Sequence, residues 1–302
     1  MLLVMSLMGL IGCDIDGDLP PCSWNVRITY NYSPYGEPFP LKECLRNLHE
    51  YVFDENGLLV GTDMGLKCTP EQTEYNLPVG TYTVVAWGNM GENTEQPVCE
   101  TGVSRLSELQ LHIKRTKDNG ADDLLYAAIP FKVGGKGRHD LKAALTDAYA
   151  TISFNVTWAG KQIPEGVTGW EMRLAKVPAA YRFKPGAQLQ AFEKNTAQFL
   201  PEFPGVEASY IAHPVRSGES ITGIFKTYRL TSDDYPVFCL YADGVPVMKE
   251  IDLERLFHES DVDPGQARVQ QYDIDVTIDG ESIYVMFTIL SGWEEGGAIG
   301  GW

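Results

Sequence analysis

The sequence lacks the short motifs that mark most enzymes. It contains no Gly-x-Ser-x-Gly elbow, no Walker loop, no His-Glu-x-x-His pair and no Gly-x-Gly-x-x-Gly fingerprint. No Cys-x-x-Cys pair occurs, and the 5 histidines are scattered without the spacing of a zinc site. Long stretches with the apolar period of a helix are missing too, which disfavours a helical bundle. We therefore expect no metal, no cofactor and no catalysis.

Positive charge is scarce as well. The chain has 24 Lys and Arg residues against 41 Asp and Glu residues, which gives a formal net charge of −17. Such a chain repels the phosphate backbone of nucleic acids and anionic lipid headgroups alike. Nucleic acids are thus unsuitable partners. We expect the protein to bind other proteins or neutral surfaces, and not a small-molecule substrate.

The abundance of carboxylates raises the possibility of a glycosidase, which needs two acids beside its substrate. Asp233-Asp234 and Asp261 with Asp263 are two candidate pairs. Both pairs stand among residues typical of turns, where solvated carboxylates are common. These aspartates are better explained as turn residues, and the chain is predicted not to be an enzyme.

An apolar run occupies the extreme N-terminus, and it is too short to span a bilayer core of about 30 Å. The run ends in Leu10-Ile11-Gly12-Cys13. This pattern is typical of a bacterial lipobox, where a signal peptidase cuts before the cysteine and the cysteine receives a lipid. It predicts a signal peptide at residues 1–12 and lipidation of Cys13. Each buried acyl methylene contributes about 0.8 kcal/mol, so several chains such as palmitate would make attachment effectively permanent.

Two features near this site leave alternatives open. A signal peptide usually begins with Lys or Arg, whereas the first basic residue here is Arg27. Three explanations stay open: the true start codon lies upstream of Met1, the chain is trimmed, or the run is the misread start of a cytosolic protein. Residues 13–23 follow as an acidic tether. Its Asp-x-Asp-x-Asp spacing from Asp14 to Asp18 invites a calcium-loop interpretation, but an EF-hand loop needs Gly in its sixth position, where Leu19 stands.

The chain has 6 cysteines, which fits an oxidising compartment better than the cytosol. With Cys13 assigned to the lipid, the candidates for disulfide bonds in the first half are Cys22, Cys44, Cys68 and Cys99, and Cys239 stands alone in the second half. Two disulfides would allow three connectivities. One disulfide with buried free thiols is the alternative, and we expect at least one bridge.

Strand patterns dominate the rest of the chain. Residues 24–32 alternate apolar and polar side chains, which is the period of a half-buried strand. Asn56-Gly57 between two apolar triplets predicts a hairpin, and the β-branched and aromatic run in residues 77–89 predicts a central strand. A short helix or turn is expected at residues 41–49, and a short amphipathic helix at residues 251–258. Further strands are expected at residues 108–114, 124–133, 150–158, 169–177, 223–230, 237–241, 271–278 and 282–290.

The chain is long enough for two domains of about 120 to 160 residues each. Gly134-Gly135-Lys136-Gly137 breaks the strand pattern near the middle. We therefore predict an N-terminal domain at residues 24–138 and a C-terminal domain at residues 139–302. Both are expected to be antiparallel β-sandwiches in tandem, so the fold class is all-β with few short helices.

Several segments together resemble the Bacteroidetes FimB-type fimbrial anchor proteins, which lie at the base of type V pili. The resemblance runs through most of the chain, and no single motif carries it alone. The similar segments are the lipidated start at Cys13, Asp18-Leu19-Pro20-Pro21-Cys22, Val26-Arg27-Ile28-Thr29-Tyr30-Asn31-Tyr32, residues 50–60, residues 77–89 and Tyr228-Arg229-Leu230.

The resemblance implies two transthyretin-like domains, a lipid anchor in the outer membrane, and display at the cell surface. It further implies that the protein fastens a fimbrial shaft and limits its length. The first shaft subunit would be held by strand addition at an exposed sheet edge. Cys13 is the one functional residue that the resemblance carries over.

Two rival functions remain. A fimbrial shaft or tip adhesin should carry a longer leader and a basic protease site, but no Lys or Arg stands between Cys13 and Trp24. A surface glycan-binding lipoprotein should expose aromatic side chains on one face. The candidates for such a face are Trp24, Trp87, Trp158 and Trp170, and an anchor is expected to bury at least Trp87.

Overall fold

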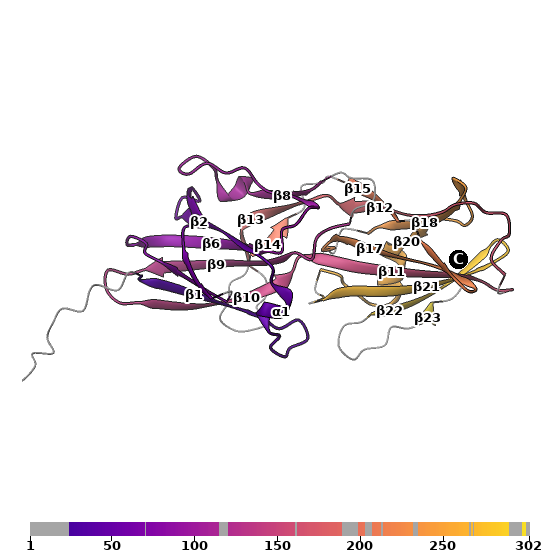
Figure 1. Ribbon diagram of the computed structural model, residues 1–302, viewed down its shortest axis with the longest axis horizontal. Coiled ribbons are helices and arrows are strands. Elements are labelled where there is room, and N and C mark those ends of the chain that lie inside the picture. Colours follow the sequence, from indigo (N-terminus) through magenta and orange to yellow (C-terminus); the bar gives the residue numbers. More distant parts are fainter. Residues whose placement is uncertain are drawn as a thin grey trace, which may run out of the picture.

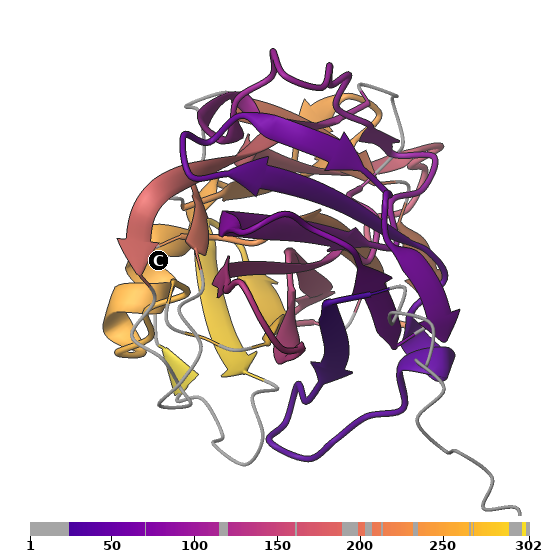
Figure 2. The same ribbon diagram turned by 90° about the vertical axis from the view of Figure 1, so that its left-hand side faces the viewer.

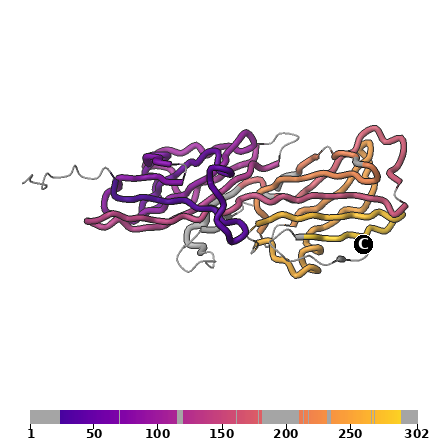
Figure 3. The backbone as a smooth tube through the Cα atoms, turned by 60° about the horizontal axis from the view of Figure 1, so that its bottom comes forward, coloured from indigo at the N-terminus to yellow at the C-terminus, as the bar shows by residue number. Residues whose placement is uncertain are grey.

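The alternating segments of the sequence form four β-sheets in the part of the chain that the structure describes. This computed structural model describes residues 24–69, 71–114, 120–160, 162–188, 199–202, 207–212, 214–231, 235–265, 267, 269–289 and 298–299. The sheets make two lobes that lie end to end along one axis (Figures 1 and 3). The elongated shape separates the two ends of the molecule.

The N-terminal lobe is built on an eight-stranded sheet that curls around its own core (Figure 2). Val26 and Ile28 on one side of the curl and Val52 and Val84 on the other are fully buried in that core. In spatial order the strands are β3 (Leu59–Thr62), β2 (Leu48–Asp54), β6 (Gly80–Gly88), β9 (Leu125–Val133), β10 (His139–Asp147), β1 (Val26–Tyr32), β5 (Gln72–Tyr75) and β4 (Leu66–Thr69).

A four-stranded sheet and a single turn of 3-10 helix, η1 (Leu106–Glu108), cover the other face of β2, β6 and β9. Trp87 and Tyr126, with ring centroids 5.7 Å apart, are buried between these layers. The sheet order is β14 (Phe199–Glu202), β13 (Ala180–Gln188), β8 (Gln110–Ile113) and β7 (Thr94–Glu95). Residues 77–89 therefore contain a central strand with both faces buried, as predicted.

The C-terminal lobe pairs a six-stranded with a five-stranded sheet. Phe154 and Phe238 stack between the sheets with ring centroids 3.6 Å apart. The larger sheet contains β16 (Val215–Ser217), β17 (Ser220–Tyr228), β11 (Tyr149–Trp158), β21 (Gln270–Asp279), β22 (Ser282–Ile289) and β23 (Ala298–Ile299). The smaller contains β15 (Glu207–Ala212), β12 (Trp170–Pro178), β18 (Val237–Ala242), β19 (Val245–Pro246) and β20 (Ile251–Asp252).

The all-β sandwich fold is confirmed, with one refinement in strand direction. The pairs β1–β10 and β11–β21 are parallel, whereas the other described pairs are antiparallel. Alternation of side chains gives the faces of a strand but not the direction of its partner. Since β1 and β10 are far apart in the sequence, no hairpin signal fixes their pairing.

The helix or turn predicted at residues 41–49 is confirmed at its start, but its last two residues belong to a strand. Helix α1 is Leu41–Cys44 alone, and Leu48 is the buried first residue of β2, where it pairs with Gly88. Sheet pairing here overrides a local helical spacing. The second predicted helix is present as α2 (Leu253–Glu259).

The predicted Asn-Gly hairpin joins β2 to β3, with Gly57 as its left-handed residue at φ 70°. The side chain of Asp54 accepts hydrogen bonds from the backbone N–H groups of Asn56 and Leu58, at 2.8 and 2.9 Å. These two hydrogen bonds hold the turn, in which Gly57 but not Asn56 has a positive φ.

The glycine-rich segment at residues 134–137 is the turn between β9 and β10, and both strands belong to the eight-stranded sheet. Strand pairing moves from the first lobe to the second at Ala148, between β10 and β11. We propose Ala148 as the domain boundary in place of residues 138 and 139. Strands β13 and β14 then return from the second half to complete the N-terminal lobe.

Helix α2 offers a test of local stability. The side chain of Asp252 accepts a hydrogen bond from the backbone N–H of Glu254 at 3.0 Å, which caps the helix that buries Leu256 and Phe257. Asp252→Ala should lower the free energy of unfolding by about 1 kcal/mol. Asp252→Asn keeps a capping oxygen and should cost less, as urea unfolding of both variants would measure.

Candidate functional site

The predicted lipidation site Cys13 and the tether residues Asp14 to Asp18 lie outside the described residues, as does Cys22. The described chain begins at Trp24, whose indole lies between two guanidinium groups. Arg27 is 4.1 Å and Arg138 is 4.4 Å from its ring centroid. These cation–π contacts fix the point where the tether would join the N-terminal lobe.

This point lies at the end of the molecule remote from the C-terminal lobe (Figure 1). Strand β1 starts beside the β9–β10 turn, with Val26 opposite His139. It ends at the junction of the lobes, where the hydroxyl of Tyr32 donates to Asp147 at 2.6 Å. The long axis of the protein therefore runs from the predicted tether through the junction to the C-terminal lobe.

None of the four cysteines within the described chain is bonded to another. Cys44 and Cys99 are partly buried, Cys68 is exposed and Cys239 is buried, and all four are free thiols. A disulfide between two of Cys44, Cys68 and Cys99 is thus not formed here. Pairing of any of them with Cys22 stays a prediction.

Sheet edges are the expected contact site for a fimbrial partner. The outer edge of β3 is covered, because Leu59 donates to Ser104 and accepts from Gly102, at 2.9 and 2.8 Å. Strand β22, which lies next to the short edge strand β23, is different. Its eight residues pair with β21 along their whole length, but β23 covers it only opposite Val285 and Met286. Among the described strands, β22 thus offers a long edge with little cover.

A groove of about 580 Å³ lies on the outer face of the same six-stranded sheet. Its polar side chains come from alternate positions of neighbouring strands, so the register places Asn155 between Thr222 and Asp275. Asn155 donates to Asp275 at 2.7 Å. Ile224, 63% exposed, and Val215, 67% exposed, add an apolar margin. The groove could hold a ligand rich in hydroxyl groups.

The sequence prediction missed this groove. Its polar residues Ser153, Asn155, Asp273 and Asp275 are the outward alternates of β11 and β21. The alternation of apolar and polar residues in the sequence indicates only that these side chains lie on a solvated face. That they gather in one groove depends on the register of strands more than one hundred residues apart.

Besides the groove, the sequence did not reveal a buried polar cluster at the junction of the lobes. Asp147 is 3% exposed, and burial raises the pKa of its carboxyl to about 6 despite the hydrogen bond from Tyr32 and the nearby charge of Arg229. Arg229 donates to the main-chain oxygen of Asp147 at 3.2 Å. These contacts join β1, β10 and the end of β17.

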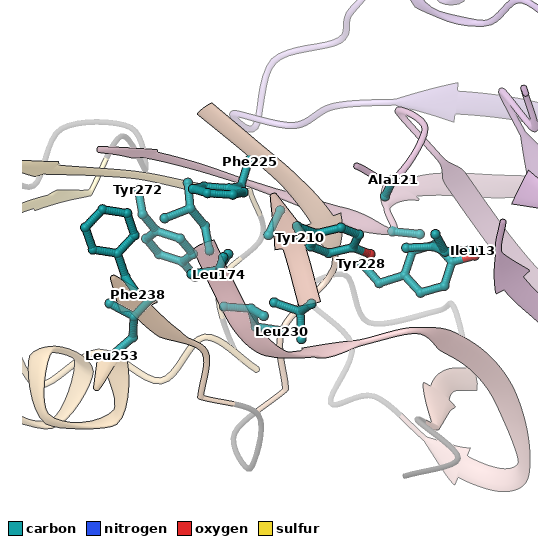
Figure 4. Close-up of a cluster of buried hydrophobic side chains, with 14 of the residues drawn as sticks. Ile113, Ala121, Leu174, Tyr210, Phe225, Tyr228, Leu230, Phe238, Leu253 and Tyr272 are labelled. Carbon is teal, nitrogen blue, oxygen red and sulfur yellow. The ribbon is translucent and has the colours of Figure 1, made fainter. Parts of the chain in front are cut away.

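Apolar packing also continues across the junction. Figure 4 shows labelled side chains that extend from Ile113 and Ala121 past Tyr228 to Phe238 in the C-terminal lobe. All belong to one cluster of buried residues. A shared core of this kind resists independent movement of the two lobes.

Elsewhere the described residues offer little catalytic chemistry. The carboxylate of Asp263 accepts from Gly265 N in an exposed turn beside Asp261, as predicted, whereas Asp233-Asp234 lie outside the described part of the chain. No three His, Cys, Asp or Glu residues gather as metal ligands among the residues described. Within the same residues, no helix has the length and apolarity needed to cross a membrane.

The four tryptophans in the described part of the chain do not form an exposed platform. Trp87 is 1% exposed and lies in the core, as the anchor prediction required. Trp158 and Trp170 are partly buried against each other, with ring centroids 5.6 Å apart. Trp24 is partly buried between its two arginines.

Three solved structures share this fold. A Bacteroides thetaiotaomicron protein for which polysaccharide binding has been suggested is 15% identical, with a TM-score of 0.66 over 91% of this chain and 97% of that one. The fimbrial anchor protein Mfa2 from Porphyromonas gingivalis is 16% identical, with a TM-score of 0.63 over 89% and 97%. A Bacteroides ovatus protein suggested to be an adhesin is 13% identical, with a TM-score of 0.62 over 90% and 95%.

At these identities the structural likeness shows the fold alone, and no curated protein sequence matches the chain. A sequence-family model gives the stronger result. The model of the Mfa2 family, described as fimbrillin-A associated anchor proteins Mfa1 and Mfa2, matches residues 19–296. The match spans nearly all of both lobes. This chain therefore belongs to the Mfa2 family of fimbrial anchor proteins.

Proposed function

We propose that this protein is an outer-membrane lipoprotein that anchors a fimbria to the cell surface and limits its length. The family match over residues 19–296 is the observation that carries the proposal. The lipobox at Cys13 supplies the membrane attachment, and residues 13–23 supply a spacer. The protein acts by binding and not by catalysis.

The geometry of the lobes supports this role. The described chain starts at the far tip of the N-terminal lobe, so a lipid on Cys13 would hold that tip toward the membrane. The tether of about ten residues reaches at most roughly 35 Å. The C-terminal lobe would then point away from the cell, where a fimbrial shaft begins.

We place the contact with the first shaft subunit at the open edge of β22. Main-chain N–H and C=O groups along an edge can bind an extended segment of another chain, and outward side chains then contact its residues. Tyr284 and Met286 are 47% and 46% exposed beside this edge. The chemistry suits a strand with apolar residues at alternate positions.

Photo-crosslinking in cells tests this contact. A photoreactive amino acid at Tyr284, on a part of β22 that β23 does not pair with, should crosslink to a fimbrial subunit, whereas the same group at Leu66 should not. Leu66 is a matched control because it is 65% exposed on β4, the edge strand of another sheet. Crosslinks at Leu66 alone would move the contact to the N-terminal lobe.

The groove on the outer face favours one second candidate, which is glycan binding at the cell surface. Carboxylate and amide side chains can hydrogen-bond to sugar hydroxyls, and the volume falls within the usual range of ligand sites. The Bacteroides thetaiotaomicron protein of similar fold, for which polysaccharide binding has been suggested, is consistent with this candidate.

A glycan array separates the two candidates. If the groove binds sugars, the Asp273→Ala and Asn155→Ala variants should bind any glycan that the wild type binds with an affinity lower by about tenfold or more. Thr151→Ala, on the same face of β11 but outside the groove lining, should bind normally. Absence of glycan binding by the wild-type protein would leave the anchor function alone.

A further inference from the structure

The two parallel strand pairs lie in series along the long axis of the molecule. In the N-terminal lobe, Val26 to Tyr32 of β1 pair in register with His139 to Leu145 of β10. Ala148 alone separates β10 from β11, which pairs in parallel with β21 over nine residues. Figures 1 and 3 show these strands running lengthwise through both lobes.

This order of strands decides how a pulling force would act. A membrane tether pulls the N-terminal end of β1 toward the tip of the N-terminal lobe. A partner on the C-terminal lobe pulls β10 through β11 in the opposite direction. Because β1 and β10 are parallel, the two forces act at opposite ends of the pair, and its hydrogen bonds are loaded in shear together.

A pair loaded at one end behaves differently. Peeling breaks one hydrogen bond at a time, and each makes only a small net contribution. Shear requires several bonds to break in the same event, so the barrier to forced unfolding is higher. Forced unfolding depends on that barrier and not on equilibrium stability.

We propose that the β1–β10 pair is a load-bearing clamp that lets the N-terminal lobe carry tension between a membrane tether and a partner on the C-terminal lobe. The β11–β21 pair repeats the arrangement, since force enters β11 at its N-terminal end. The biological purpose of the clamp rests on the proposed anchor function. Its mechanical strength is a property of the fold alone.

Side chains reinforce both ends of the first pair. At the tip, the Trp24 indole lies between Arg27 of β1 and Arg138 beside β10, and Arg27 is also 3.8 Å from Asp140. At the junction, the Tyr32 hydroxyl bonds to Asp147. A force that slides β1 along β10 must therefore break contacts at both ends.

The second pair has links of the same kind. Asn155 of β11 donates to Asp275 of β21 at 2.7 Å. The hydroxyl groups of Thr157 and Thr277 lie 3.2 Å apart across the same two strands. Side chains thus join the strands of each parallel pair directly.

Single-molecule pulling of the purified full chain in two directions tests the clamp. In the shear direction, handles are placed just before Trp24 and at Met286 through a bio-orthogonal amino acid. In the peeling direction, the second handle is moved to Lys136, in the β9–β10 turn beside the start of β1. The fold is the same in both cases, so only the direction of the force differs.

The clamp predicts an unfolding force several-fold higher in the shear direction at equal pulling speed. When the clamp fails, the chain between Tyr32 and His139 is released, which lengthens the molecule by roughly 370 Å when extended. A shear force equal to or below the peeling force would overturn the proposal. That result would leave the anchor function standing, because the measurement uses no membrane or fimbria.

Discussion

Replacing Cys13 with alanine should release the protein, together with the fimbriae it holds, from the cell into the medium. Without the thiol no acyl chain can be attached, and the described residues contain no helix able to cross a membrane in its place. Each buried acyl methylene contributes about 0.8 kcal/mol, so a protein with several acyl chains should lose nearly all of its membrane affinity. We expect label from a fatty-acid probe to disappear and fimbriae to appear in the culture supernatant.

Cys22→Ala is the matched control, because it removes a nearby thiol from the same N-terminal region and leaves the lipobox intact. It should keep both the fatty-acid label and the attached fimbriae. Loss of label in Cys13→Ala while fimbriae stay on the cell would retain the lipoprotein and contradict the anchor function.

Replacing Asp147 with asparagine should stabilise the protein at neutral pH and flatten its dependence on pH. Burial raises the pKa of Asp147 to about 6 in the folded state, against about 4 in an unfolded chain. Between these values the folded state binds more protons than the unfolded state, so stability falls as the pH rises from 4 to 6. At pH 7 the penalty for the ionised carboxyl is fully present, at about 3 kcal/mol.

Asparagine carries no charge and still offers an oxygen to the Tyr32 hydroxyl. The free energy of unfolding of the variant, relative to that of the wild type, should increase as the pH rises from about 4 to 7, and urea unfolding would measure this difference. Glu50, whose pKa is also raised by burial, contributes equally to both proteins. Asp279→Asn, at an exposed strand end, should follow the wild-type curve. A variant less stable than wild type at pH 7 would show that the charge itself stabilises the junction.

Local patterns were enough to predict many of the strands that bury one or both faces. Residues 77–89 are rich in β-branched and aromatic side chains, and they contain β6 in the middle of its sheet. Strand β10 was not predicted. Its Leu141, Ala144 and Leu145 have helical spacing, and the strand exists because it pairs with β1 on one side and β9 on the other.

Strand β13 was missed for another reason. Pro185 and Gly186 interrupt its pattern, and its partners β8 and β14 lie far from it in the sequence or beyond a long connection. Such pairings depend on long-range register, which alternation does not contain. The same limit explains why the strand direction and the buried state of Asp147 could not be predicted.

The sequence alone also suggested only one part of the candidate site. The lipobox at Cys13 is a local motif, so the sequence alone suffices to propose membrane attachment. The open edge of β22 and the groove near Asn155 arise only when strands meet. Edges and grooves are properties of the assembled sheets.

Electron microscopy of fimbriae from cells that carry an epitope-tagged copy of this protein tests the anchor function most directly. The tag belongs in the exposed Asp243-Gly244 turn of the C-terminal lobe, which joins β18 to β19 in the sheet that does not contain β22. Gold-labelled antibody should mark one end of each fimbria, at the cell surface, and deletion of the gene should give longer, detached fimbriae. Label along the whole shaft, or fimbriae without any label, would contradict the proposal that this protein anchors the fimbria at its base.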